Sequence, residues 1–165
     1  MQESPHMIMK KSLLEKMLTA VTFAALLGVF LYLGLIWHSL PKEIPVHFGI
    51  NGKPDSWGQT GMIWVLPVIG LLLSIVFTAL EAFPNIYNFP VPITESNAEK
   101  QYNNARMLLC LLKTEISLFF VYETWQSAQI AYGAKHSLGL WNIPVLFIVV
   151  FGTIGISIYR SIKAK

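Results

Sequence analysis

"MLTAVTFAALLGVFLYLGLIWHSL", residues 17–40, contains no Asp, Glu, Lys or Arg. A helix needs about 20 apolar residues to cross the roughly 30 Å hydrocarbon core of a bilayer. The stretch therefore predicts a membrane-spanning helix. Three later segments are also long and mostly apolar, so we expect an all-α membrane protein with a four-transmembrane-helix bundle. The predicted spans are residues 17–40, 61–80, 106–130 and 140–159.

The composition of the whole chain agrees with a membrane location. Of its 165 residues, 54% are hydrophobic and 13% are charged, whereas soluble domains carry about 25% charged residues. The basic residues form no stripe with interleaved aromatic residues, so we expect no nucleic-acid partner. The single cysteine, Cys110, excludes an intramolecular disulfide and a zinc site built from thiolates. Residues 1–8 are interpreted as an expression scar or a disordered N-terminus, and residues 9–165 as one membrane domain.

The distribution of Lys and Arg predicts the orientation in the membrane. Both termini and the loop 81–105 hold most of these residues, whereas the loops on the other side hold three Lys. Cytoplasmic loops carry the Lys/Arg excess, so both termini are predicted to face the cytoplasm of a bacterial inner membrane. All five tryptophans lie near span ends on the outer side, as an aromatic belt requires. They are Trp37, Trp57, Trp64, Trp125 and Trp141.

The loop between the first two spans contains a hairpin signal. Residues 43–48 (EIPVHF) alternate in character, and Asn51-Gly52 is typical of a two-residue hairpin turn. We predict a short extracytoplasmic β-hairpin that brings Asp55 near His47 and Phe48, with Phe48 on the face opposite His47. Two interpretations of His47 and Asp55 stay open: a hydrogen-bonded pair that fixes the loop, or a metal or proton-handling pair. Metal sites usually have three or more protein ligands, and the sequence identifies no cofactor.

Small residues recur every four positions in the first two spans. Ala20, Ala24 and Gly28 share one face of the first helix, and Gly70 and Ser74 share one face of the second. Such faces let helix backbones approach closely. We therefore expect both faces to form helix contacts inside the bundle.

The span 106–130 contains three charged residues, Lys113, Glu115 and Glu123. An ionisable side chain at a helix centre costs about 2.5–3.5 kcal/mol on insertion scales, so an intramembrane carboxylate indicates a functional site. Lys113 is predicted to extend to the cytoplasmic face. A polar stripe with Glu123 at its margin is predicted to face the bundle, as an interhelical seam, a ligand cleft, or a proton or ion path. Its members are Glu115, Tyr122, Gln126 and Gln129.

The loop before this span mixes prolines with charges, which is typical of a solvated connector. Glu81 is therefore expected in water. Two interpretations of Gln101, Tyr102 and Arg106 stay open: contact with lipid headgroups or a cytoplasmic partner, or an ordinary helix start.

The pattern P-x-x-I-P-x-H-F-x-x-x-G-x-x-D-x-W at residues 41–57 resembles the signature of a bacterial membrane family called domain of unknown function 1648. The run at 95–113 is similar to what often follows it in short members. The family includes the N-terminal domain of immunity proteins against a sporulation-delaying toxin. The resemblance implies a membrane fold with an outward hairpin, and it supplies no catalytic residue. The matched residues are Pro41, Ile44, Pro45, His47, Phe48, Gly52, Asp55 and Trp57.

Two functional hypotheses of different classes follow. No nucleophile elbow, phosphate loop, zinc-protease helix or dinucleotide fingerprint occurs in the sequence, so an enzyme is not supported. The first hypothesis is a small membrane protein whose extracytoplasmic loop recognises a peptide, lipid or envelope partner in an immunity, sensing or accessory role. The alternative is a minimal transporter, or a membrane-embedded metal- or proton-dependent catalyst, that uses Glu115 and Glu123 with His47 and Asp55. A homo-oligomer, or a structural subunit of a larger assembly, stays open. The candidate binding residues are His47, Phe48, Asn51, Asp55, Trp57, Glu115, Tyr122, Glu123 and Gln126.

Overall fold

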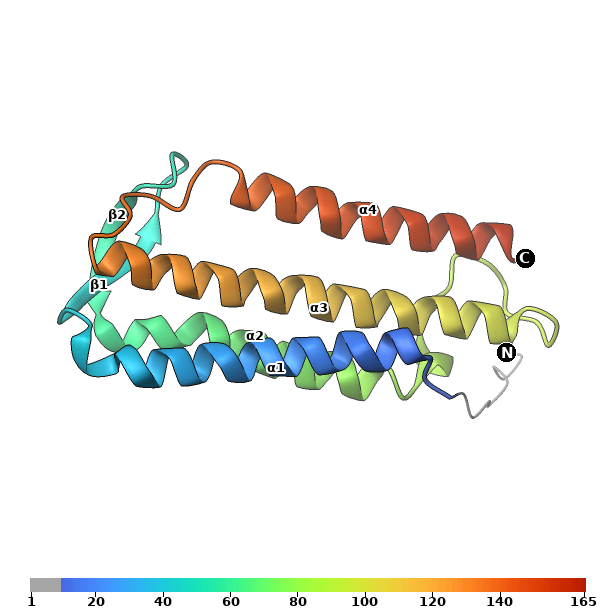
Figure 1. The fold of residues 1–165 in the computed structure, drawn as a ribbon. Coiled ribbons are helices and arrows are strands. Elements are labelled where there is room, and N and C mark those ends of the chain that lie inside the picture. Colours follow the sequence, from blue (N-terminus) through green and yellow to red (C-terminus); the bar gives the residue numbers. More distant parts are fainter. Residues whose placement is uncertain (1–9) are drawn as a thin grey trace.

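The computed structural model describes residues 10–165. Within this part, four α-helices lie side by side and a two-stranded hairpin crosses one end of them (Figure 1). The helices are α1 (Leu13–Ile36), α2 (Val65–Leu80), α3 (Ala98–Ala131) and α4 (Asn142–Lys163), and the strands are β1 (Glu43–Phe48) and β2 (Pro54–Gln59). Three short 3-10 helices complete the order: η1 (Trp37–Ser39), η2 (Thr60–Trp64) and η3 (Pro84–Ile86). The predicted scar at residues 1–8 lies outside the described residues, and the division into one membrane domain stays a prediction.

Helix α3 is the centre of the structure. It packs against α1, α2 and α4, whereas α4 packs mainly on α3 (Figure 1). The rest of α4 presents apolar side chains at the surface, such as Ile148, which is 71% exposed, and Phe151, which is 62% exposed. Helix α4 is therefore a flanking helix that packs mainly on α3.

Within residues 10–165, three segments are long and apolar enough to cross a membrane: Leu13–Ser39, Thr60–Leu80 and Asn142–Lys163. Helix α3 is not among them because its polar and charged residues interrupt its apolar sequence. It is also longer than its predicted span, since it begins at Ala98 rather than Arg106. The predicted helical fold with a small hairpin is confirmed, and three of its helices suggest a membrane protein.

The two predicted small-residue faces have different outcomes. The buried face of α1 consists of residues three or four apart, as one helix face requires: Thr22, Leu26, Val29 and Leu33. Ala20, Ala24 and Gly28 are exposed instead, so the prediction for this face is wrong. Hydropathy is uniformly high around α1, and the larger side chains rather than the small ones fill the contact with α3.

The small residues of α2 do lie in a helix contact. At Gly70, a β-carbon would lie 3.3 Å from a methyl carbon of Leu26 and 3.4 Å from the ring of Phe120. The hydroxyl of Ser74 hydrogen-bonds with that of Ser117 on α3 at 2.7 Å. The predicted close approach at this face is therefore confirmed.

The hairpin turn is longer than predicted. Residues 49–53 connect the strands, with the Gly49 amide donating to the Lys53 carbonyl at 2.9 Å and the Gly52 amide to the Gly49 carbonyl at 2.8 Å. A two-residue type I′ turn needs positive φ at both central positions. In this loop only Gly52 has one, at +71°, and the Asn51 side chain accepts a hydrogen bond from the Lys53 amide instead. The prediction of a two-residue turn is wrong for this reason.

The register of the hairpin also departs from simple alternation. The strands pair antiparallel, but two irregularities fall between Pro45 and Phe48. His47 and Phe48 both line the same cavity, as do all residues from 44 to 50. The irregularities interrupt the unbroken two-residue period on which the prediction of opposite faces depends, and that prediction stays a prediction.

Two contacts fix the hairpin on the helices. Ile44 is 1% exposed and belongs to a core cluster with Leu33 of α1 and Ile63 of η2. The Leu138 amide donates to the Gly52 carbonyl at 2.8 Å. The hairpin and the loop between α3 and α4 therefore form one end of the molecule.

Candidate functional site: a cavity beneath the hairpin

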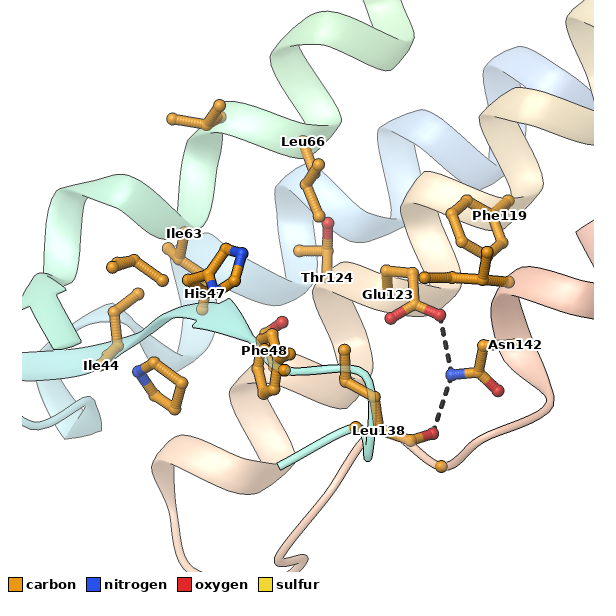
Figure 2. A pocket seen from close by; sticks show the side chains of 18 of the residues that line it. Ile44, His47, Phe48, Ile63, Leu66, Phe119, Glu123, Thr124, Leu138 and Asn142 are labelled. Carbon is orange, nitrogen blue, oxygen red and sulfur yellow. Dashed lines mark hydrogen bonds between the residues drawn. The ribbon is translucent and has the colours of Figure 1, made fainter. Parts of the chain in front are cut away.

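A cavity of about 620 Å³ lies at the hairpin end of the helices. Its walls come from β1, the start of α2, the last third of α3, the loop after α3 and the first turn of α4 (Figure 2). Most of its lining is apolar, with Ile44, Phe48, Ile63, Leu66 and Phe119 among the labelled side chains in Figure 2. The hairpin thus forms one wall of an apolar cavity that the helices alone would leave open.

Glu123 places a carboxyl group in this cavity. The residue is 6% exposed, and one carboxylate oxygen accepts a hydrogen bond from Asn142 Nδ2 at 2.8 Å. The same amide nitrogen donates to the Leu138 carbonyl at 2.8 Å, which holds the start of α4 against the loop (Figure 2). The second carboxylate oxygen makes no hydrogen bond with the described residues and points into the cavity (Figure 2). Burial of a carboxylate in an apolar enclosure is costly unless its charge is compensated.

His47 reaches the same cavity from β1, and Asp55 of β2 lies beside it. His47 Nδ1 and Asp55 Oδ1 are 2.5 Å apart, in a pair whose side chains are 70% and 50% exposed. Asp55 does not line the cavity. The predicted proximity is therefore observed, with the pair at the cavity rim and largely in solvent, where an ion pair contributes little to stability.

The other predicted site residues do not converge on the cavity. Asn51 lies in the hairpin loop, and Trp57, which is 55% exposed, lies on β2. Tyr122 is 44% exposed and accepts a hydrogen bond from the buried Gln126, which also bonds Lys135. Of the nine candidates, the cavity brings together His47, Phe48 and Glu123.

Glu115 and Glu123 take part in a polar seam between α3 and α4. Thr153 Oγ1 donates to one oxygen of Glu115 at 2.6 Å, and two further polar contacts continue the seam toward the far end. The seam pairs are Asn142–Glu123, Thr153–Glu115, Ser157–Asn104 and Ser161–Gln101. Of the three interpretations of the polar stripe on α3, these contacts fit the interhelical seam. They place Glu115 and Glu123 at different positions along α4.

Metal ligands do not cluster in the part of the chain that the structure describes. In residues 10–165, no group of three or more His, Cys, Asp or Glu side chains could hold a metal ion. His47 and Asp55 form a two-residue pair, which falls short of a usual first-row site.

Residues 24–71 match the model of the family described as domain of unknown function (DUF1648). The match runs from the middle of α1 through the hairpin into α2, so the resemblance carried by residues 41–57 is confirmed. The run at 95–113 lies outside it, and the relation to toxin-immunity proteins stays a prediction.

A distant relative covers more of the chain. An uncharacterized protein of the archaeon Archaeoglobus fulgidus is 24% identical over an alignment of 149 residues, and the alignment covers 82% of this chain and 78% of that protein. No solved structure matches the chain. The DUF1648 segment supplies the hairpin wall of the cavity, whereas Glu123 and Asn142 come from the region after it.

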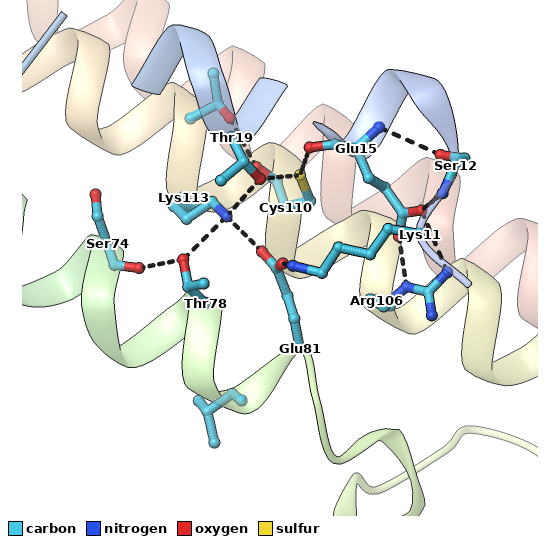
Figure 3. A network of polar contacts seen from close by, with 12 residues as sticks. Lys11, Ser12, Glu15, Thr19, Ser74, Thr78, Glu81, Arg106, Cys110 and Lys113 are labelled. Atoms are coloured by element: carbon cyan, nitrogen blue, oxygen red, sulfur yellow. Dashed lines mark hydrogen bonds and ion pairs between the residues drawn. The ribbon is translucent and has the colours of Figure 1, made fainter. Parts of the chain in front are cut away.

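A second polar cluster, also outside the DUF1648 segment, lies toward the opposite end of the helices (Figure 3). Lys113 is fully buried, and its ammonium donates to Glu81 Oε1 at 2.6 Å and to the hydroxyls of Thr19 and Thr78 at 3.0 and 3.2 Å. The other oxygen of Glu81 accepts from Lys11 at 2.6 Å. The predictions that Glu81 lies in water and that Lys113 extends to the cytoplasmic face are both wrong. Lys11 and Lys113 thus share the buried Glu81 carboxylate, which compensates the Lys113 charge that would otherwise be unpaired in the core.

Arg106 belongs to the same end of the structure. It is 4% exposed, and its Nε donates to Glu15 Oε1 at 2.6 Å (Figure 3). Gln101 and Tyr102 are also buried, so the interpretation that these three residues face headgroups or a partner is wrong. They belong to the first part of α3, which begins at Ala98. The useful signal was the presence of Glu15 and Glu81 near the ends of α1 and α2, at the level where α3 carries its cations.

Proposed function

We propose that this chain is an integral membrane protein with four membrane-crossing helices, and that its hairpin-end cavity binds the apolar part of an amphipathic ligand. The three apolar helices support the membrane location. The fourth crossing would be α3, whose 34 residues extend about 51 Å at 1.5 Å per residue. Its two interior cations are paired with acids in α1 and directly after α2, so they need not meet lipid.

The proposed orientation places the hairpin outside the cytoplasm. Most Lys and Arg residues lie at the termini and in the loop between α2 and α3, which are at the end opposite the hairpin (Figure 1). All five tryptophans lie in elements at the hairpin end, where an interfacial belt would hold them at headgroup level. The archaeal relative widens the proposed location to the cytoplasmic membrane of a prokaryote.

The observation that carries the binding proposal is the cavity itself. Its volume of about 620 Å³ falls within the roughly 300–1,000 Å³ of small-molecule sites, and such sites combine apolar walls with few polar groups. The lining meets this description, with Glu123, His47, Thr124, Ser127 and Asn142 as its main polar side chains. The hairpin, which the first hypothesis assigned to recognition, forms part of the wall.

Protection of an introduced cysteine tests the proposal. In a Cys110→Ala background in phosphatidylcholine nanodiscs, Leu66→Cys places a thiol in the cavity wall, and Leu72→Cys places one on the outer face of α2, where the native residue is 58% exposed. Dodecanol should slow alkylation of Leu66→Cys by N-ethylmaleimide and leave Leu72→Cys unaffected, as mass spectrometry can measure. Equal slowing at both positions, or none at either, would contradict ligand binding in the cavity.

A further inference from the structure

We infer that the cavity recognises a primary ammonium group on an apolar chain, with Glu123 as the residue that receives it. This inference rests on the proposed function, since it requires that the cavity bind a ligand. It specifies the chemical class of that ligand.

The first reason is that Glu123 has no cationic partner among the described residues, in contrast to the buried Glu15 and Glu81. Glu115 also pairs with a neutral group and has a buried oxygen without a hydrogen bond, but it does not line the cavity. Glu15 lies 2.6 Å from Arg106, and Glu81 lies 2.6 Å from each of two lysines. Glu123 is buried to a similar degree, yet its contact with the described residues is the neutral amide of Asn142. Its free oxygen opens on the cavity (Figure 2). A bound cation would supply there the charge that Arg106 and Lys113 supply elsewhere.

The second reason is that hydroxyl oxygens line the same cavity as Glu123. Thr124 and Ser127 are both among its lining residues, and Ser127 lies four residues after Glu123, on the same face of α3. The Thr124 hydroxyl donates to the Phe120 carbonyl at 2.7 Å, so its oxygen remains an acceptor. A primary ammonium has three donors and no acceptor, which suits a cavity that offers a carboxylate and hydroxyl oxygens.

The third reason is the charge of the rest of the wall. Among the described residues that line the cavity there is no Lys or Arg. His47 faces the carboxylate of Asp55 at 2.5 Å, which offsets any positive charge on the ring. Lys135 lies nearby but bonds Gln126 and sits 4.8 Å from the Trp125 ring centre, outside the lining. The cavity walls therefore offer no counterion to a ligand carboxylate, whereas they offer Glu123 as a counterion to a ligand ammonium.

The test compares three dodecyl compounds in the Leu66→Cys protection assay, with amounts expressed as mole fraction in the nanodisc. Dodecylamine should protect at a mole fraction about tenfold below that of dodecanol, because a charge-assisted hydrogen bond is stronger than a neutral one, and dodecanoate should protect least. Glu123→Gln should abolish the advantage of the amine. Glu115→Gln is the matched control, since this acid faces α4 outside the cavity, and it should retain the advantage.

The outcomes separate the two proposals. If dodecylamine and dodecanol protect the Glu123-containing protein equally, or if Glu123→Gln keeps the tenfold difference, the ammonium inference is overturned and the cavity proposal stands. If no dodecyl compound protects, the cavity proposal itself fails. The comparison of amine with alcohol needs no change at Glu123, so misfolding of that variant leaves the test decisive. Adding phosphatidylethanolamine to the nanodiscs distinguishes two sources of the ammonium group. If this lipid protects Leu66→Cys, the ammonium belongs to a lipid headgroup. If dodecylamine protects and phosphatidylethanolamine does not, the ammonium belongs to a free amphiphile.

Discussion

Substitution of Glu81 tests most directly how buried charges are paired between the helices. Lys113 is fully buried and Glu81 is its counterion at 2.6 Å, whereas the side chain of Lys11, the second partner, is 33% exposed. In Glu81→Gln, Lys11 can return to water, but Lys113 stays in the core without a compensating charge. An unpaired buried charge costs about 3–5 kcal/mol. The Gln carbonyl and two threonine hydroxyls still accept hydrogen bonds, so we expect a loss of about 3 kcal/mol.

The converse change should be less damaging. Lys113→Met removes the buried cation, fills similar volume, and leaves Glu81 bonded to Lys11 at 2.6 Å. We expect a loss of about 1.5 kcal/mol, the lower value for a hydrogen bond to a charged group. Glu95→Gln, at an exposed position, is the matched control and should change stability by less than about 0.5 kcal/mol.

The assay is unfolding by sodium dodecyl sulfate in mixed micelles, followed by circular dichroism of the helices. The free energy of unfolding should fall in the order control, Lys113→Met, Glu81→Gln. A Glu81→Gln protein as stable as the control would refute the buried ion pair. If Lys113→Met loses as much as Glu81→Gln, Lys11 does not share the carboxylate.

Three further predictions concern packing, the hairpin and ionisation. Gly70→Leu should destabilise the protein by about 1–3 kcal/mol through overpacking against α1 and α3. A β-carbon at Gly70 would already lie 3.3 Å from its nearest neighbour, whereas nothing lies within 4 Å of one at Gly28. Similar losses for Gly70→Leu and Gly28→Leu in detergent unfolding would contradict this packing. Gly52→Ala should lower the free energy of unfolding by about 1–3 kcal/mol and weaken the protection of Leu66→Cys by dodecanol. The backbone φ of Gly52 is +71°, and the new β-carbon would lie 2.8 Å from the Gly139 carbonyl oxygen. Gly61→Ala, with open space around it, is the control, and equal effects of the two substitutions would rule out a special constraint at Gly52. Burial, reinforced by the nearby Glu81 carboxylate, raises the pKa of Tyr87 from its usual 10 to about 12. The folded state therefore keeps a proton that the unfolded chain loses, so stability should fall as the pH rises from 10 to about 12, a loss that Tyr87→Phe should lack. Subtracting the ultraviolet titration of Tyr87→Phe from that of the unchanged protein isolates Tyr87, and a midpoint near 10 in this difference would contradict the prediction.

The sequence predicts elements better than it predicts partners. The uncharged run at 17–40 and the two later apolar runs correspond to helices because length and hydropathy alone decide whether a segment can cross a bilayer. The hairpin was also predictable, since β-branched alternation and Asn51-Gly52 are local signals. Its exact turn and register were not, because alternation and a turn motif do not specify the irregularities between Pro45 and Phe48. The contact of Gly52 with Leu138 also joins residues that are far apart in the sequence.

Burial of charged residues depends on tertiary contacts that one helical pattern cannot reveal. Glu81 follows an apolar run and precedes a proline-rich loop, which looks like a solvated setting, yet cations on α3 and in front of α1 enclose it. Glu123 was a candidate because it is an acid in an apolar span. Its partner Asn142 lies beyond an irregular loop, so its place in the cavity wall follows from the path of that loop rather than from the helix period.

Side-specific labelling tests the central claim, that α3 crosses the membrane with the hairpin outside. In a Cys110→Ala background, Asn51→Cys, Ala134→Cys and Glu95→Cys place thiols at exposed positions in the hairpin, the α3–α4 loop and the α2–α3 loop. A membrane-impermeant maleimide should label Asn51→Cys and Ala134→Cys in intact bacterial cells, and Glu95→Cys only after permeabilisation. Labelling of Glu95→Cys and Ala134→Cys from the same side would show that α3 does not cross the membrane.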